Sequence, residues 1–198
     1  MGIKIDLNSK IKSSFEGPSS DYRLAQNRFK HILETKLGVV TRAQENPGQS
    51  SSVSGAGPDN IGIPSGVTAD LIDSKLKGTP IAGLGHAFVE AEKKHGVNSI
   101  FLASLAVHES AYGSSAIAQD KKNLFGFGAF DASPYAKAYT FDSFEQGIDH
   151  VAGYLAKNYL NETGRYYNGV SVESVGKKYA TDPNWANAIE KIMKAMVE

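Results

Sequence analysis

Glu109 is the residue of this sequence whose setting most favours acid–base chemistry. It follows Leu105 by four positions and Leu102 by seven, so on a helix that begins after Asn98 it projects from the apolar face. Burial, the negative end of the helix dipole and the lack of a Lys or Arg within one turn all favour a raised pKa for its carboxyl group. Such a group is suited to act as a general acid near neutral pH. The alternative is a partly exposed Glu at a helix end, hydrogen-bonded to the next loop.

A glycosidic bond is one substrate for such an acid, but its hydrolysis needs a second group that stabilises the transition state or positions water. Asp182 precedes Pro183 and fits a helix start, and Asp142 precedes a capping box. Asp131, in the run Ala-Phe-Asp-Ala-Ser-Pro, has no such duty, although a turn-forming Asp is an equally good interpretation. Sugars also stack on aromatic rings, and the candidates for that role are Phe127, Phe130, Tyr135, Tyr166, Tyr167 and Tyr179.

Other catalytic motifs are incomplete. The pair His108-Glu109 lacks the second His of a zinc protease motif, because Tyr112 stands four residues after His108. Gly126-Phe127-Gly128 lacks the Lys of a phosphate-binding loop. No Gly-x-Ser-x-Gly turn occurs, although a Ser-His-Asp triad in another arrangement stays open. The chain has no cysteine, and its five histidines are scattered, so we expect neither a bound metal nor a cofactor.

The composition is typical of a soluble globular protein. The chain has 198 residues, is 41% hydrophobic and carries 21 basic and 21 acidic residues. This balance gives no electrostatic footprint for nucleic acid or for an anionic membrane, and no apolar run is long enough to span a bilayer. The first residues lack the apolar core of a signal peptide, so we expect either an export signal missing from this sequence or another route out of the cell.

Two regions of different character follow one another. Residues 1–66 contain one amphipathic helix, expected at 21–37, and then a linker rich in Ser, Gly and Pro. Residues 67–198 read as a mainly α-helical domain, in which Tyr139-Thr140-Phe141 is the expected return strand of a small β-hairpin. The helices of this domain are expected at about 68–77, 81–95, 98–110, 143–159, 172–179 and 182–196.

Three separated motifs in the second region resemble one family. They are GLGHAFVEAEKKHGVNSIFLASLAVHESAYGSS, NLFGFGAFDASP and VGKKYATDPNWA, and they resemble the bacterial peptidoglycan endo-β-N-acetylglucosaminidases of glycoside hydrolase family 73. The resemblance implies a lysozyme-like helical fold with a small β-lobe across a cleft. It also implies hydrolysis of the β-1,4 bond between N-acetylglucosamine and N-acetylmuramic acid in cell walls, as in autolysins and phage lysins.

The resemblance also assigns roles to single positions. Glu109 matches the family's general acid, and Tyr179 matches a tyrosine near the reaction centre, with Asp182 close behind. Asp131 resembles an Asp that some members carry in a shorter hairpin, which leaves inversion with a base and assistance by the substrate's N-acetyl group both open. The residues that match the motif lining the cleft floor are Asn123, Leu124, Phe125 and Gly126.

Competing functions remain at this point. A lytic transglycosylase, whose chemistry can run on a single Glu, and a muramidase are alternatives on the same fold. An inactive glycan-binding module, for example in a phage tail, is an alternative from another class of function. For each active form the expected partner is a peptidoglycan strand, and the expected location is outside the cell or at the cell wall. The region 1–66 is expected to dock on a larger assembly or to mediate self-association.

Overall fold

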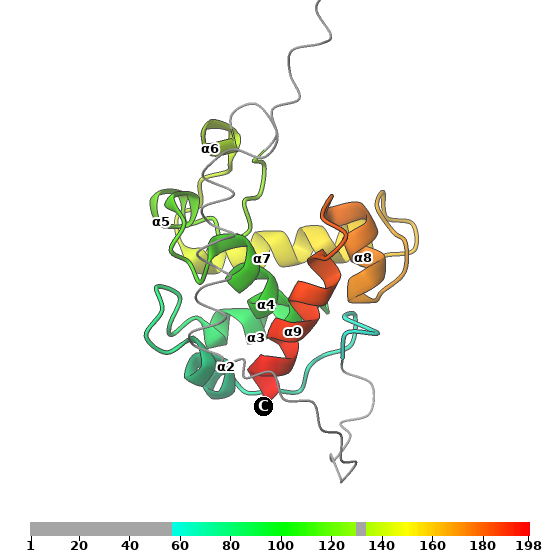
Figure 1. The fold of residues 1–198 in the computed structure, drawn as a ribbon, viewed down its shortest axis with the longest axis horizontal. Coiled ribbons are helices and arrows are strands. Elements are labelled where there is room, and N and C mark those ends of the chain that lie inside the picture. The colour runs from blue at the N-terminus through cyan, green and yellow to red at the C-terminus, as the bar shows by residue number, and fades with distance from the viewer. Residues whose placement is uncertain (1–56, 130–133) are drawn as a thin grey trace, which may run out of the picture. The chain divides into compact units, whose positions relative to one another are not determined.

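Helices make up the ordered framework of this chain. The computed structural model describes residues 57–129 and 134–198, which all fall within one packed unit. These residues form no β-strand, and their isolated β-bridge joins Gly57 to Asn60. The helices (Figure 1) are α2 (Ala69–Leu76), α3 (Gly85–His95), α4 (Ser99–Ser110), α5 (Ala116–Lys121), α6 (Pro134–Lys137), α7 (Phe144–Leu155), the π-helical segment η1 (Ala156–Leu160), α8 (Val172–Tyr179) and α9 (Trp185–Val197).

Helix α4 lies at the centre of this packing. Every side chain from Ile100 to Val107 is buried, so the expectation of one apolar stripe was too narrow. The reason is that α3 packs against one part of its surface and α9, which runs alongside α4 in Figure 1, covers another. A helix that is apolar all round is typical of the middle of a domain. Glu109 therefore stands at the end of the most buried helix of the described chain.

Several helix ends are confirmed, because their capping bonds are present. The side chains of Thr68, Asn98 and Ser143 each accept a backbone N–H from the first turn of the helix that follows. Gln146 completes the last of these caps by accepting the N–H of Asp142 at 2.7 Å. Gly96, with φ of 72°, ends α3 in the left-handed conformation that a glycine adopts without strain.

Two predicted helices begin later than expected. The helix expected from residue 81 starts at Gly85, because Gly83 has φ of 86° and the chain there still turns. The helix expected from Asp182 starts at Trp185. The carboxylate of Asp182 accepts the N–H of Asn184 at 2.8 Å, which closes a turn before the helix rather than capping its first turn.

The hairpin is the expectation that the described residues do not reproduce. Residues 139–141 form no strand, because only two separate backbone bonds hold them: Tyr139 N–H to Phe127 and Phe141 N–H to Lys121, each 2.9 Å. Residues 134–137, which the hairpin would have included, form the short helix α6. The helix predicted at 21–37 lies outside the described residues, and so do Phe130 and Asp131.

The packed region begins earlier than the boundary predicted at residue 66. Ile61 is buried, its N–H bonds to Val170 at 2.9 Å, and its carbonyl accepts the N–H of Asn98 at 2.9 Å. Val172 N–H bonds to Pro58 at 2.8 Å. Residues 57–66 are thus held by the start of α4 and the start of α8, and the Gly- and Pro-rich composition that predicted a linker there was misleading.

Candidate active site

The chain reverses abruptly just after Glu109. Ala111, Tyr112 and Gly113 follow one another with φ of 50°, 59° and 80°. Two of these three are not glycine, and a non-glycine residue in the left-handed region costs about 1–2 kcal/mol. Gly113 is required at its place, because a Cβ there would lie 2.4 Å from Cγ2 of Ile81. Strain of this kind concentrates at functional sites and persists only where the surroundings fix it.

Ser110 supplies much of that support. Its hydroxyl is buried, donates to the carbonyl of Ala106 and accepts the N–H of Gly113 at 2.7 Å. The carbonyl of Ser110 accepts the N–H of Ser115 at 3.0 Å, and Gln119 donates its side-chain amide to Gly113 at 2.6 Å. The last turn of α4 is therefore tied to the start of α5, which holds the Glu109 backbone in place.

The carboxyl group of Glu109 is partly buried and accepts the indole N–H of Trp185, with 3.1 Å between Nε1 and Oε1. Burial raises its pKa to about 7, and the indole hydrogen bond opposes that rise. The raised pKa expected from the sequence is confirmed. Near neutral pH the group exists in both protonation states, which is the condition that a general acid requires.

Tyr179 lies beside this carboxyl group. Burial raises the pKa of its phenol well above the ordinary value, and the charges of Glu109 and Tyr159 add to the rise. Burial lowers the pKa of His108, the neighbour of Glu109, and the charge of Asp182 partly offsets this lowering. Asp182 therefore lies close to His108. Glu109 from one predicted motif and Tyr179 and Asp182 from another thus gather around the end of α4.

Asn123 organises the loop of residues 123–127. It is buried, and its side-chain N–H2 donates to the carbonyls of Phe127 and Tyr139, each at 2.9 Å. Its side-chain oxygen accepts the N–H of Phe125 at 3.3 Å and of Phe127 at 3.0 Å. These four bonds use the full capacity of the amide, so Asn123 shapes the loop from within.

The other residues of the predicted cleft floor divide between core and surface. Leu124 and Phe125 are 1% and 5% exposed and belong to the hydrophobic core. Gly126 is partly exposed with φ of 60°, and Phe127 next to it is also partly exposed. Of these residues, only Gly126 and Phe127 are exposed enough to contact a ligand.

A continuous row of aromatic rings joins Glu109 to this loop. From Trp185 the ring centroids run to Tyr179 (5.1 Å), from there to Tyr159 (5.8 Å), on to Tyr154 (6.3 Å) and finally to Phe127 (4.9 Å). Tyr154 and Tyr159 are five residues apart and would lie about 140° apart on a regular α-helix. The π-helical segment η1 begins between them, and its wider turn brings both rings into the row.

Two further predicted aromatic residues lie differently. Tyr166 joins the row at Tyr159, with 5.1 Å between centroids. Tyr135 on α6 is 49% exposed, donates its hydroxyl to Asp120 at 2.8 Å and lies under the ammonium group of Lys121. Nothing described links Tyr135 to Glu109.

Trp185, Tyr159 and Tyr154 were not among the site residues predicted from the sequence. A signal for Trp185 was available, because a buried indole N–H needs an acceptor and an acid was already proposed. No comparable signal existed for Tyr154, since its place in the row depends on the π-helical turn, which regular helical periodicity does not reveal.

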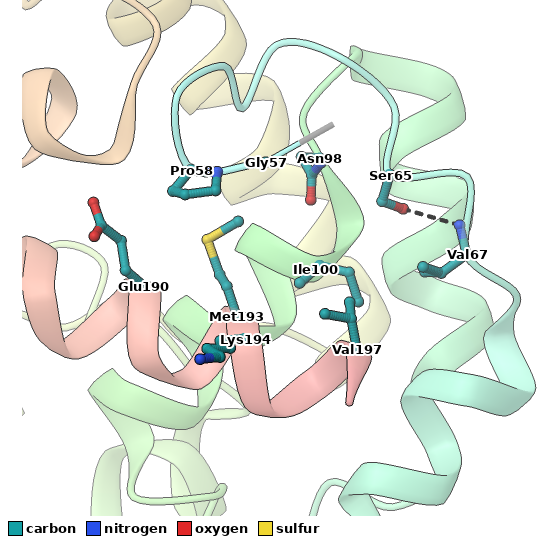
Figure 2. A pocket seen from close by; sticks show the side chains of 10 residues that line it. All are labelled: Gly57, Pro58, Ser65, Val67, Asn98, Ile100, Glu190, Met193, Lys194 and Val197. Carbon is teal, nitrogen blue, oxygen red and sulfur yellow. Dashed lines mark hydrogen bonds between the residues drawn. The ribbon is translucent and has the colours of Figure 1, made fainter. Parts of the chain in front are cut away.

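One hollow among the described residues lies away from Glu109. It has a volume of about 420 Å³ and lies between the C-terminal half of α9 and residues 57–67, near the start of α4. Figure 2 shows Met193 and Val197 of α9 facing it from one side and Pro58 and Val67 from the other. None of the residues around Glu109 lines it, so it is separate from the candidate active site.

Among residues 57–129 and 134–198, no helix is long and apolar enough to cross a membrane. The same residues contain no group of three or more His, Cys, Asp or Glu side chains arranged to hold a metal ion.

A helical domain that presents one carboxyl group of raised pKa beside a row of aromatic rings has the features of a glycoside hydrolase. Comparison with protein families agrees: residues 85–198 match the Glucosaminidase family, described as mannosyl-glycoprotein endo-β-N-acetylglucosaminidase. The chain belongs to this family, and the resemblance to glycoside hydrolase family 73 is confirmed.

Individual relatives carry related names. A Streptococcus pneumoniae protein named as an endo-β-N-acetylglucosaminidase is 36% identical over 114 residues, covering 58% of this chain and 17% of that protein. The bifunctional autolysin of Staphylococcus aureus is 26% identical over 193 residues, covering 85% of this chain and 15% of its own length. The chain therefore spans about a sixth of the curated relatives that it matches.

A solved structure gives the fold. A catalytic mutant of S. aureus autolysin E, crystallised with the disaccharide NAG-NAM, superposes with a TM-score of 0.58 at 23% identity, covering 87% of this chain and 89% of that one. At this identity the match shows a shared fold and nothing finer. The mainly α-helical, lysozyme-like fold predicted from the sequence is confirmed by this match to an autolysin, while the hairpin lobe and the N-terminal helix are not.

Proposed function

We propose that this protein hydrolyses peptidoglycan as an endo-β-N-acetylglucosaminidase, with Glu109 as the general acid. The observation that carries the proposal is the carboxyl group of Glu109, with a pKa of about 7, at the end of α4 beside Tyr179 and Trp185. Family membership and the names of the relatives give the reaction class. The bond we propose is the β-1,4 bond between N-acetylglucosamine and N-acetylmuramic acid.

The reaction follows from the properties of this group. Protonated Glu109 donates its proton to the glycosidic oxygen as the bond from that oxygen to C1 breaks, and positive charge develops on the sugar as in an oxocarbenium ion. The carboxylate that remains accepts the indole N–H of Trp185. A water molecule then adds at C1, and its proton passes to a base. Where that base is a group other than Glu109, exchange with bulk water returns a proton to Glu109 and removes one from the base.

Two routes are proposed for the attack at C1. In the first, Asp131 is the base that takes the proton of the attacking water. In the second, the N-acetyl oxygen of the substrate attacks C1 as the glycosidic bond breaks, water then opens the cyclic intermediate, and the Glu109 carboxylate takes the proton of that water. Asp131 lies outside the described residues, so both routes remain proposals. The variant Asp131→Asn separates them. If Asp131 is the base, turnover falls by about two to four orders of magnitude, as for Glu109→Gln. If the substrate assists, turnover stays near that of the wild type.

The aromatic row is proposed to support the glycan. Sugar rings stack on partly exposed aromatic faces, and Phe127, Tyr154 and Tyr166 are all partly exposed. The row leads from the acid to the loop that Asn123 organises, a direction in which successive sugars of one strand would lie. Gly126 leaves the loop backbone open beside Phe127, and Asn123, Leu124 and Phe125 would act by shaping the loop.

The test is to digest purified cell walls and to identify the new reducing end. Reducing N-acetylglucosamine is the expected product. Reducing N-acetylmuramic acid would identify a muramidase, and a 1,6-anhydro sugar would identify a lytic transglycosylase. If no bond is cleaved while Glu109→Gln and the wild type bind walls equally, the protein is a glycan-binding module.

The place of action and the partners are proposed on the same basis. The relatives named autolysins point to the cell wall, and peptidoglycan strands are the proposed partner. The suggestion that residues 1–66 mediate assembly stays a prediction. Light scattering on the full chain and on a chain lacking residues 1–66 tests it: a change from oligomer to monomer supports it, and equal masses contradict it.

A further inference from the structure

The indole of Trp185 is buried and tightly packed beside Glu109. It is 4% exposed, donates its N–H to Oε1 of Glu109 at 3.1 Å and packs against Tyr179 with 5.1 Å between ring centroids and 32° between planes. Both contacts come from residues at the candidate active site. The indole is thus fixed by one polar and one aromatic contact to the groups around the acid.

Gly176 makes room for this ring. It lies inside α8, one turn before Tyr179, where a glycine costs about 1 kcal/mol relative to alanine. A Cβ at Gly176 would lie 2.9 Å from Cε3 and 3.2 Å from Cζ3 of Trp185, closer than such contacts allow. The indole therefore occupies the space that any other residue at this position would fill, which accounts for a glycine in a helix interior.

We infer that Trp185 is a positioning residue for Glu109 and that Gly176 is the residue that lets it reach the carboxyl group. The inference rests on the proposed function, in which Glu109 is the acid. An indole N–H can only donate, so it bonds Oε1 whether or not the carboxyl group is protonated. The proton of the neutral acid is then confined to Oε2, and the carboxyl plane is held while the proton leaves.

The indole also sets the pH range of the acid. Its hydrogen bond lowers the pKa of Glu109 against the larger rise caused by burial. The other titratable groups at this site are His108 on α4, Tyr179 on α8 and Asp182 in the turn before α9. None of these depends on the indole N–H for its charge, so removing that donor acts on Glu109 itself.

The test compares Trp185→Phe and Gly176→Ala with the wild type. Trp185→Phe keeps an aromatic ring and removes the donor. Gly176→Ala keeps the donor and displaces the ring. Gly153→Ala is the matched control, because its new Cβ would also meet an aromatic ring, 3.1 Å from Cε1 of His95, but on α7 and away from Glu109.

Two readouts are needed for each protein. The first is the pH dependence of kcat for wall digestion, whose alkaline midpoint reports the acid. The second does not depend on activity: it is the pH dependence of unfolding stability, measured with and without an added Glu109→Gln substitution. The difference between those two curves has its upper midpoint at the pKa of Glu109.

In Trp185→Phe and Gly176→Ala both midpoints should move to higher pH, and kcat should fall about tenfold, below the hundredfold that a displacement of about 1 Å can cost, with less change in KM. Gly153→Ala should leave both midpoints in place. A fall in kcat with unmoved midpoints would show a merely structural role and overturn the inference. If the wild type digests no wall, the proposed function fails, and the stability midpoints still decide whether the indole controls the carboxyl group.

Discussion

A glutamate lies at each end of α4, and the two are held in opposite ways: Glu92 of α3, which is buried, contacts the start of α4, and Glu109, which is partly buried, belongs to its last turn. At the N-terminal end, Oε2 of Glu92 accepts the N–H groups of Ser65 and Ser99, each at 2.6 Å. At the C-terminal end, Glu109 accepts the indole N–H of Trp185 at the longer distance of 3.1 Å. The helix dipole stabilises a negative charge at the first end and opposes it at the second. Glu92 acts as a clasp, because it joins Ser65 to the start of α4. Glu109 is able to lose and regain a proton.

The backbone shows the same contrast. The first turn of α4 is capped by Asn98 in an ordinary way, and Ser65 and Ser99 share a hydroxyl hydrogen bond of 2.7 Å beside Glu92. The last turn ends in the left-handed pair Ala111-Tyr112. The start of α4 is therefore stabilised by capping hydrogen bonds, and the backbone after its end is strained. Such strain is expected at a functional site, where the surrounding structure fixes an unfavourable backbone conformation.

Removing the acid should have the largest effect on this comparison. Glu109→Gln keeps the size of the side chain and removes the transferable proton, so we expect turnover to fall by about two to four orders of magnitude. Wall binding should persist, because no contact surface is lost. Release of reducing ends and binding to sedimented walls measure the two effects, and a loss below about threefold would contradict the assignment of the acid.

Removing the clasp should act on stability instead. Glu92→Ala leaves the buried N–H groups of Ser65 and Ser99 without an acceptor, and at about 1–3 kcal/mol for each group the expected loss is about 2–6 kcal/mol. Glu92→Gln is the matched variant: its amide oxygen can accept the same two bonds, so it should lose less than half as much. Urea denaturation measures both. Activity per folded molecule should be unchanged, and a specific loss of turnover would break the division between the two ends.

The pH dependence of stability should also differ between the wild type and Glu109→Gln. The pKa of Glu109 is raised from 4.5 to about 7 on folding. Its favourable contribution is therefore complete below about pH 4.5 and is lost as the pH rises through 7, because only the unfolded chain is ionised between these values. At about 1.4 kcal/mol per pKa unit, the loss is about 3 kcal/mol.

Glu109→Gln has no proton to lose, so it should match the wild type near pH 4 and exceed it in stability by about 3 kcal/mol at pH 8. Denaturation midpoints at a series of pH values give this difference directly. Parallel curves for the two proteins would show that the carboxyl group is not held in a setting that disfavours its charge.

The raised pKa of Glu109 could be predicted from the sequence better than the contacts around it, for a physical reason. The position of Glu109 relative to Leu102 and Leu105 depends only on helical spacing, and local apolar neighbours and the helix end already determine the direction of its pKa. Glu92 has no such signal: on α3 it reads as an ordinary charged residue, and its burial depends on Ser65, 27 positions away. Contacts between distant segments are what periodicity cannot supply.

The same limit explains the misplaced boundary and the missed strand. Residues 57–66 have the composition of a linker. They are nevertheless packed, because this segment forms single backbone hydrogen bonds with Val170, Val172 and Asn98. Tyr139 to Phe141 has the composition of a strand, and it stays irregular because Asn123 takes the carbonyl of Tyr139 with its side chain. In both segments a partner from elsewhere in the chain overrides local preference.

The smallest effect should come from relaxing the strained turn after Glu109. Ser110→Ala removes the hydroxyl that accepts the N–H of Gly113 and donates to Ala106, with an expected stability loss of about 1–2 kcal/mol. The control is Ser114→Ala in the same turn, whose exposed hydroxyl only donates to Ala111 and should matter by less than about 0.5 kcal/mol. Hydrogen exchange at the Gly113 amide should accelerate in Ser110→Ala and not in Ser114→Ala. Equal behaviour of the two variants would mean that the left-handed pair is held by the packing of Ile81 against Gly113. The hydrogen bonds of the Ser110 hydroxyl would then not be needed to hold the C-terminal end of α4.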